Sequence, residues 1–326
     1  MYPMAGGFSA MRILLCAVLS ISAPLPVAAL EWPRQRPIQL VIGFAPASST
    51  DIVARLVAPK VAEALGQSVV VENRPGAGGN VAAQQVKRAA PDGYTLLVTS
   101  VAYAVNPSLY ANAGYDPLKD FVGVAQGPST PNIITVHPSV PARNLAELIE
   151  LAKKQPLSYA SSGIGTSTHL SVERIKMARK VDITHVPYQP AAAVGAVVGG
   201  HTQVSSTSLP PAVPHVKAGR VRPIAVTSAQ RSAVLPEVPT VNEQGFADFD
   251  DLTWFAFFAP AGTPEGVVAR LNGEINRALE APEVHERLAQ LGLDWKRATV
   301  PEFAAFLRAE VAKWANAVKE SGAKAD

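Results

Sequence analysis

The sequence predicts an α/β protein of two lobes, with one domain inserted into another and two long strands crossing between them. Strand-like and helix-like stretches alternate along the chain, which is typical of parallel sheets covered by helices on both faces. Two apolar stretches, 121–137 and 254–259, do not fit a single sheet and flank a segment with its own strands and helices. Hydrophobic residues make up 48% of the 326 residues, so the chain can bury a sizeable core.

The individual elements follow from the spacing of apolar residues. Residues 38–44 form a short, β-branched run bounded by prolines, which predicts a buried strand. From Asp51 to Gly66 the apolar positions follow a helical period, and Pro59 is expected to kink that helix. The same reasoning predicts further strands at 69–71, 95–99, 157–160, 183–186 and 221–227, and helices at 80–90, 145–154, 166–178, 191–198 and after Pro264, Pro282 and Pro301.

The first thirty residues have the pattern of a secretory signal peptide. Arg12 precedes an apolar run, 13–21, which is too short to span a bilayer, and small residues follow it up to Ala29. Cleavage is expected near Ala29, and either Met1 or Met11 is the true start. The single cysteine lies in this leader, so the mature chain is expected to hold neither a disulfide nor a catalytic thiol.

These features divide the chain into a leader and two domains. The leader covers residues 1–29. Domain 1 is discontinuous and comprises 30–131 plus 254–326, and domain 2 is the inserted segment 132–253. Such an architecture places a cleft between the lobes and a hinge beneath it.

Charge and motif spacing argue against several classes of function. Lys and Arg number 29 against 26 Asp and Glu, without a basic run, so binding of nucleic acid is not expected. No Gly-x-Ser-x-Gly motif is present, and Ser167 and His169 lie too close on one predicted helix to act as nucleophile and base. The six histidines lack the spacing of metal ligands. The sequence therefore predicts a protein without catalytic residues, metal or cofactor.

Hydroxyl-rich turns follow several predicted strands. One turn spans 44–51 and another 159–169, each directly before a helix, and Thr99 and Ser100 end a third strand. Unpaired N–H groups and the positive partial charge of a helix N-terminus suit a carboxylate without an arginine. Each turn alone is explained better by ordinary helix caps. Two such turns facing each other favour an anion-binding cleft, whose wall would include Tyr188 unless that residue belongs to the core.

Seven motifs carry a family resemblance. In chain order they are Phe-Ala-Pro-x-x-Ser-Thr-Asp (44–51), Val-Glu-Asn-Arg-Pro-Gly-Ala-Gly-Gly-Asn (71–80), Ala-Pro-Asp-Gly-Tyr-Thr-Leu (90–96), Tyr-Ala-Ser-Ser-Gly-Ile-Gly (159–165), His-Val-Pro-Tyr (185–188), Leu-Pro-Glu-Val-Pro-Thr (235–240) and Phe-Ala-Pro-Ala-Gly-Thr-Pro (258–264). Over the whole mature chain the sequence resembles the Bug/TctC family, the periplasmic solute-binding components of tripartite tricarboxylate transporters.

The resemblance implies a periplasmic-binding-protein-like fold that closes on a small organic carboxylate, with membrane permease subunits as partners. A monomer in the periplasm is expected. The expected ligand-binding residues are Phe44, Ala47, Ser48, Ser49, Asp51, Thr99, Ser100, Ser161, Ser162, Gly165, Thr166, Ser167, Tyr188 and Thr207. Among them Asp51 is expected to orient its helix rather than to touch an anionic ligand.

This chain departs from the family pattern beside the expected ligand. Ala47 and Ser48 stand where the family usually has two glycines, so the Ser48 side chain either bonds the ligand or narrows the cleft. Thr207 stands in place of an acid, which disfavours amino-acid ligands because no carboxylate remains there for an ammonium group. Two other functions stay open: a ligand sensor that docks on a signalling receptor, and a secreted hydrolase.

Overall fold

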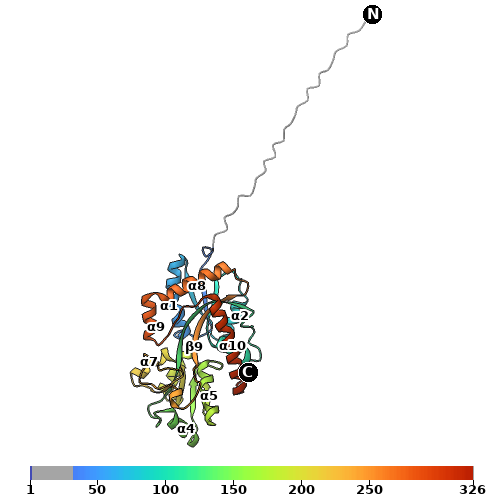
Figure 1. Cartoon of the computed structure of the whole chain (residues 1–326). Coiled ribbons are helices and arrows are strands. Elements are labelled where there is room, and N and C mark those ends of the chain that lie inside the picture. The colour runs from blue at the N-terminus through green and yellow to red at the C-terminus, as the bar shows by residue number, and fades with distance from the viewer. Residues whose placement is uncertain (2–31, 326) are drawn as a thin grey trace.

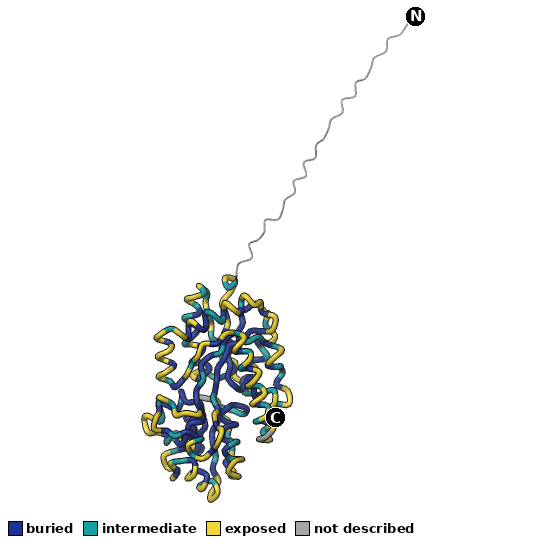
Figure 2. The backbone as a smooth tube through the Cα atoms, in the orientation of Figure 1, coloured by how far each residue is buried: buried dark blue, intermediate teal, exposed yellow. Residues whose placement is uncertain are grey.

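The computed structural model describes Met1 and residues 32–325, and it has two lobes that lie end to end (Figure 1). The predicted signal peptide, apart from Met1, lies outside the described residues. Among the described residues, no helix combines the length and the apolar character needed to cross a membrane. The buried residues gather inside each lobe, and the exposed ones lie on the helices that cover them (Figure 2).

In the part of the chain that the structure describes, nine strands form one continuous, strongly bent sheet. In lobe 1, which corresponds to predicted domain 1, the strand order is β2-β1-β3-β9-β4. In lobe 2, which corresponds to predicted domain 2, the sheet continues as β4-β7-β5-β6, with β8 on the other side of β4. The strands are β1 (Ile38–Ile42), β2 (Val69–Asn73), β3 (Thr95–Ser100), β4 (Phe121–Val136), β5 (Ser158–Ser161), β6 (Thr184–Pro187), β7 (Val204–Ser208), β8 (Arg222–Val226) and β9 (Leu252–Pro260).

Strand β4 passes from one lobe to the other. Its residues 121–131 pair with β9, and from Asn132 onward it pairs with β7 and β8. The returning chain reaches lobe 1 just before β9, whose first residue, Leu252, lies opposite Pro131. The predicted α/β fold with two crossing segments is confirmed. The domain boundaries at 131/132 and 253/254 stay a prediction, which this change of partner strands supports.

The alternation of strands and helices predicts parallel sheets, but the strands at the centre of the molecule are antiparallel. Strand β1 runs parallel to β2 and β3, and β5 runs parallel to β6 and β7. Strand β9 instead lies between β3 and β4 and is antiparallel to both. The alternation of strands and helices does not reveal this, because β9 returns from the other lobe rather than from a neighbouring crossover.

Within residues 32–325, ten α-helices cover the sheet: α1 (Ser49–Leu65), α2 (Asn80–Lys87), α3 (Ala102–Leu109), α4 (Leu145–Lys154), α5 (Ser167–Arg179), α6 (Pro190–Val198), α7 (Leu209–Lys217), α8 (Glu265–Glu280), α9 (Pro282–Gln290) and α10 (Val300–Ser321). Helix α1 runs through Pro59 as a single element, so the proline does not end it. Two short helices, α3 and α7, were not predicted, since prolines interrupt their apolar pattern.

Alternation along β1 shows how the two faces of the lobe 1 sheet are filled. Ile38, Leu40 and Ile42 point into the core cluster that contains residues of α1 and α8. Val41 points to the opposite face, into the cluster that contains residues of α2, α3 and α10. Both faces of this sheet are therefore covered by apolar side chains. This packing fixes the positions of the carboxyl ends of β1 and β3 and of the helices that follow them.

Candidate functional site

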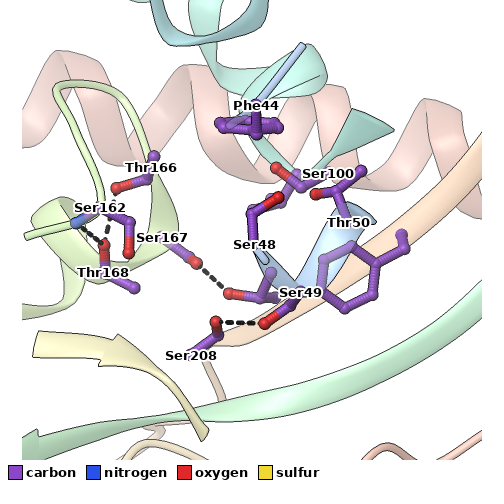
Figure 3. Close-up of a pocket in the computed structure, with 13 residues that line it drawn as sticks. Phe44, Ser48, Ser49, Thr50, Ser100, Ser162, Thr166, Ser167, Thr168 and Ser208 are labelled. Carbon is purple, nitrogen blue, oxygen red and sulfur yellow. Dashed lines mark hydrogen bonds between the residues drawn. The ribbon is translucent and has the colours of Figure 1, made fainter. Parts of the chain in front are cut away.

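Four helices point their N-termini at one small cavity between the lobes. The N-caps are Ser48 of α1 and Val101 of α3 in lobe 1, and Thr166 of α5 and Ser208 of α7 in lobe 2. The cavity is lined by Phe44, Ser48, Ser49, Thr50, Ser100, Val101, Ser162, Thr166, Ser167, Thr168, Ser208, Thr253 and Phe255 (Figure 3). The lining contains no charged residue, so the electrostatic attraction for an anion comes from backbone amides and helix dipoles.

Hydrogen bonds to the Asp51 carboxylate fix the turn before α1. The Asp51 carboxylate accepts hydrogen bonds from the Ala47 amide at 3.0 Å, from Arg55 Nε at 3.0 Å and from Asn73 Nδ2 at 2.9 Å. Burial raises the pKa of Asp51, but the bonds from Arg55, Asn73 and Ala47 outweigh it and leave the pKa below its usual value. Ser48 Oγ accepts from the Asp51 amide and caps the helix.

The turn before α5 is held by its own hydroxyls. Thr166 Oγ1 donates to the Gly163 carbonyl at 2.7 Å and lies 2.7 Å from Thr168 Oγ1. Thr168 Oγ1 in turn accepts from the Ser162 amide at 3.1 Å. These bonds point the first amides of α5 at the cavity, since the first amides of a helix have no carbonyl partner within it.

Two stacked histidines support this turn from inside lobe 2. The rings of His169 and His185 lie 4.1 Å apart; His169 Nδ1 accepts from the Gly165 amide, and His185 Nε2 contacts Ser161 Oγ at 2.7 Å. Burial, with Lys176 nearby, lowers the pKa of His169 to about 4. Burial and the adjacent His169 lower the pKa of His185 to about 3. Both rings are therefore neutral at pH 7.

Hydroxyl contacts lie around the cavity, and the contact between Ser49 and Ser208 joins the two lobes. Ser49 Oγ of α1 lies 2.8 Å from Ser208 Oγ, and Ser167 Oγ of α5 lies 2.6 Å from Thr253 Oγ1 of β9 (Figure 3). The cavity has a volume of about 30 Å³, which is room for about two water molecules. A ligand of several carbon atoms therefore needs the lobes to move apart, and the Ser49–Ser208 contact opens with them.

The structure places the expected ligand-binding residues in two groups. Phe44, Ser48, Ser49, Ser100, Ser162, Thr166 and Ser167 line the cavity. Ala47, Asp51, Thr99, Ser161, Gly165, Tyr188 and Thr207 do not. Contact with a ligand therefore stays a prediction for both groups, and the lining of the cavity supports it for the first group only.

Each residue of the second group has another role or place. Ala47 and Asp51 bond each other behind the first turn, and Ser161 bonds His185 beneath the second. Gly165 faces Asn106 and Leu109 of α3 rather than the cavity. Tyr188 packs on a small alanine cluster of lobe 2, whereas Thr99 and Thr207 are buried within β3 and β7.

Six residues that line the cavity are not among the predicted ligand-binding residues: Thr50, Val101, Thr168, Ser208, Thr253 and Phe255. Thr50 and Thr168 lie inside the two predicted turns, so the same hydroxyl-rich pattern before a helix also points to them. Ser208 is the N-cap of a helix that was not predicted. Thr253 reaches the cavity only because β9 pairs with β4, with Thr253 opposite Thr130.

Comparison with known proteins places the chain in a family. Residues 53–323 match the model of the TctC family, described as the tripartite tricarboxylate transporter family receptor. The chain is 35% identical to protein BugT of Bordetella pertussis (strain Tohama I) over 304 residues, which cover 92% of this chain and 93% of BugT.

Solved structures agree with this result. An R. palustris protein solved with adipate has a TM-score of 0.85 and 34% identity, covering 89% of this chain and 98% of its own. MatC from Rhodopseudomonas palustris with bound malate has a TM-score of 0.83 and 33% identity, covering 87% of this chain and 99% of its own. The family resemblance seen in the seven motifs is confirmed: the chain belongs to the TctC family of tripartite tricarboxylate transporter receptors.

Proposed function

We propose that this protein captures a small organic carboxylate in the periplasm and delivers it to the membrane subunits of a tripartite tricarboxylate-type transporter. The observation that carries the proposal is the convergence of four helix N-termini on an uncharged, hydroxyl-lined cavity between two lobes. The relatives solved with adipate and with malate support a carboxylate as the ligand. The predicted signal peptide supports a periplasmic location.

A hydrolase is the second candidate, because Ser161 Oγ lies 2.7 Å from His185 Nε2. That distance suits a nucleophile and its base. Ser161, however, is fully buried and does not line the cavity, and its oxygen also accepts from the Gly163 amide. A substrate carbonyl would have no path to it, so we assign the pair to the support of the turn before α5. Incubation with carboxylate esters is expected to give no turnover.

A thermal-shift screen over mono-, di- and tricarboxylates tests the proposed function. A ligand present at about 100 times its dissociation constant stabilises the folded state by about 2.7 kcal/mol, which raises the midpoint of unfolding by several degrees. We expect at least one carboxylate to do so, and neutral sugars of similar size to have no effect. If no carboxylate shifts the midpoint, the proposal is wrong.

The role in transport needs a second measurement. Vesicles that contain the membrane subunits of the transporter are expected to take up the carboxylate only when the liganded protein is present outside them. If the liganded protein instead binds a signalling receptor and leaves uptake unchanged, the protein is a sensor.

A further inference from the structure

A buried relay of hydrogen bonds connects the Arg174–Asp251 ion pair to the wall of the cavity; its members are Asp251, Ser171, Asn132, Thr253 and Ser167. Asp251 is 1% exposed and accepts from Arg174 Nη1 at 2.5 Å. A carboxylate can only accept hydrogen bonds. Ser171 Oγ, 3.1 Å from Asp251 Oδ2, therefore donates its single hydrogen to Asp251.

The direction of that bond fixes the orientation of the Asn132 side chain. Because Ser171 has given its hydrogen to Asp251, it can only accept from the Asn132 amide, which lies 3.3 Å away and presents Nδ2. Asn132 Oδ1 then faces the other way. It lies 2.7 Å from Thr253 Oγ1 and 3.3 Å from Ser167 Oγ. Asn132 is fully buried at the point where β4 changes lobes, so water cannot replace these partners.

Thr253 and Ser167 consequently have no hydrogen left for a ligand. Their hydroxyl oxygens lie 2.6 Å apart and both contact Asn132 Oδ1, which has no hydrogen of its own. The three oxygens share two hydrogens, one from each hydroxyl. Either Ser167 donates to Thr253 and Thr253 donates to Asn132, or Thr253 donates to Ser167 and Ser167 donates to Asn132. Both hydrogens are used within the three residues in either case. Both residues line the cavity, so their hydroxyls have only lone pairs to offer a ligand there.

Hydrogen-bond donors lie elsewhere around the cavity. Ser48 Oγ accepts from the Asp51 amide and keeps its own hydrogen. Ser162 Oγ is buried and has no hydrogen-bond partner among the described residues. Ser49 and Ser208 share one bond, so one of their two hydrogens is available, and both become available when that contact opens. These donors and the helix N-termini suit a carboxylate, whereas Thr253 and Ser167 suit a group that donates.

We propose that the ligand is a hydroxy-carboxylate, whose hydroxyl group donates its hydrogen to Thr253 or Ser167 while its carboxylate accepts from the donors. This inference rests on the proposed function and narrows it to a substrate class. An acid without the hydroxyl leaves the lone pairs of Thr253 and Ser167 facing carbon, which loses a hydrogen bond inside a closed site. An amino acid could also donate, but its ammonium group would lose water in a cavity with no anionic lining residue.

Calorimetry with matched acids tests the proposal. Malate and succinate differ only by a hydroxyl, as do lactate and propionate. In each pair that binds, we expect the hydroxy acid to bind about tenfold more tightly, at the upper end of what one hydrogen bond contributes. Alanine is expected to bind more weakly than lactate. Equal affinities within the pairs, or tighter binding of the acid without the hydroxyl, would overturn the inference.

Two variants assign the preference to these residues. In the Ser167→Ala, Thr253→Val double variant both acceptors are removed, and the ratio of affinities within a pair is expected to fall to about one. In Ser48→Ala a donor is lost, so both acids weaken by a similar factor and the ratio stays. An unchanged ratio in the double variant overturns the inference. If no carboxylate in the thermal-shift screen binds the wild-type protein, the proposed function itself fails; if carboxylates bind without a hydroxyl preference, this inference alone fails.

Discussion

Replacing Gly165 with alanine is expected to weaken carboxylate binding by about tenfold or more. Gly165 has φ +78°, and an added Cβ would lie 2.5 Å from Leu109 Cδ2 and 2.6 Å from Asn106 Oδ1. Both neighbours belong to α3 of lobe 1, whereas Gly165 belongs to lobe 2. The methyl group therefore pushes the lobes apart in the closed form, and overpacking of this kind typically costs about 1–3 kcal/mol. A ligand that binds the closed form must supply that difference.

Gly163→Ala is the matched control for this variant. Gly163 also has a positive φ, +117°, but an added Cβ would meet its nearest atoms at 3.7 and 3.9 Å, which is ordinary contact. Both variants strain the backbone of the same turn, and only Gly165→Ala interferes with lobe 1. Titration calorimetry on the two variants separates the effects. Equal dissociation constants for the two variants would contradict a close approach of the lobes at Gly165.

Acidification from pH 7 to pH 4.5 is expected to destabilise the fold by several kcal/mol. Burial lowers the pKa of His169 to about 4 and that of His185 to about 3, from an ordinary value of 6.5. Below pH 6.5 the unfolded chain therefore binds protons that the folded protein does not, so stability falls as the pH drops towards 4. The loss is on the order of 2 kcal/mol for His169, the more buried of the two. Asp51, whose pKa is also lowered, adds a loss of the same sign at still lower pH.

Urea unfolding at a series of pH values measures this effect. His169→Asn keeps a hydrogen-bond acceptor near the Gly165 amide but does not titrate, so its stability is expected to vary less between pH 7 and 4.5. His201→Gln, at an exposed position after α6, is the control and is expected to follow the wild type. A His169→Asn profile with the same slope as the wild type would show that the stacked pair is not the origin of the acid sensitivity.

The two turns before α1 and α5 are easier to predict from the sequence than the helices α3 and α7, which also border the cavity. The turns before α1 and α5 were predictable because hydroxyls and glycines follow an apolar strand and precede a helical period. Helices α3 and α7 were missed because Pro107 in the former, and Pro210, Pro211 and Pro214 in the latter, interrupt short apolar stretches. Both helices nevertheless supply N-termini to the cavity.

Strand register decides which side chain of a strand faces the cavity. Thr207 was expected to contact the ligand, but its neighbour Ser208 lines the cavity. Successive residues of a strand point to opposite faces, so a shift of one position exchanges the buried face for the cavity. The register that places Ser208 opposite Asn132, and Thr253 opposite Thr130, is a property of pairings between strands more than seventy residues apart. The spacing of residues along the chain contains no signal for it.

Comparing a carboxylate with its own amide by titration calorimetry tests the central claim most directly. The claim is that amides, hydroxyls and helix dipoles of both lobes hold an anion in a cavity whose lining has no charged side chain. The carboxylate found by thermal shift is expected to bind at least a hundredfold more tightly than its amide, because hydrogen bonds to a charged group are worth about 1.5–3 kcal/mol each. The affinity is expected to change little between low and high salt, since closure shields the anion from bulk ions. Equal affinity for the acid and the amide would contradict the account.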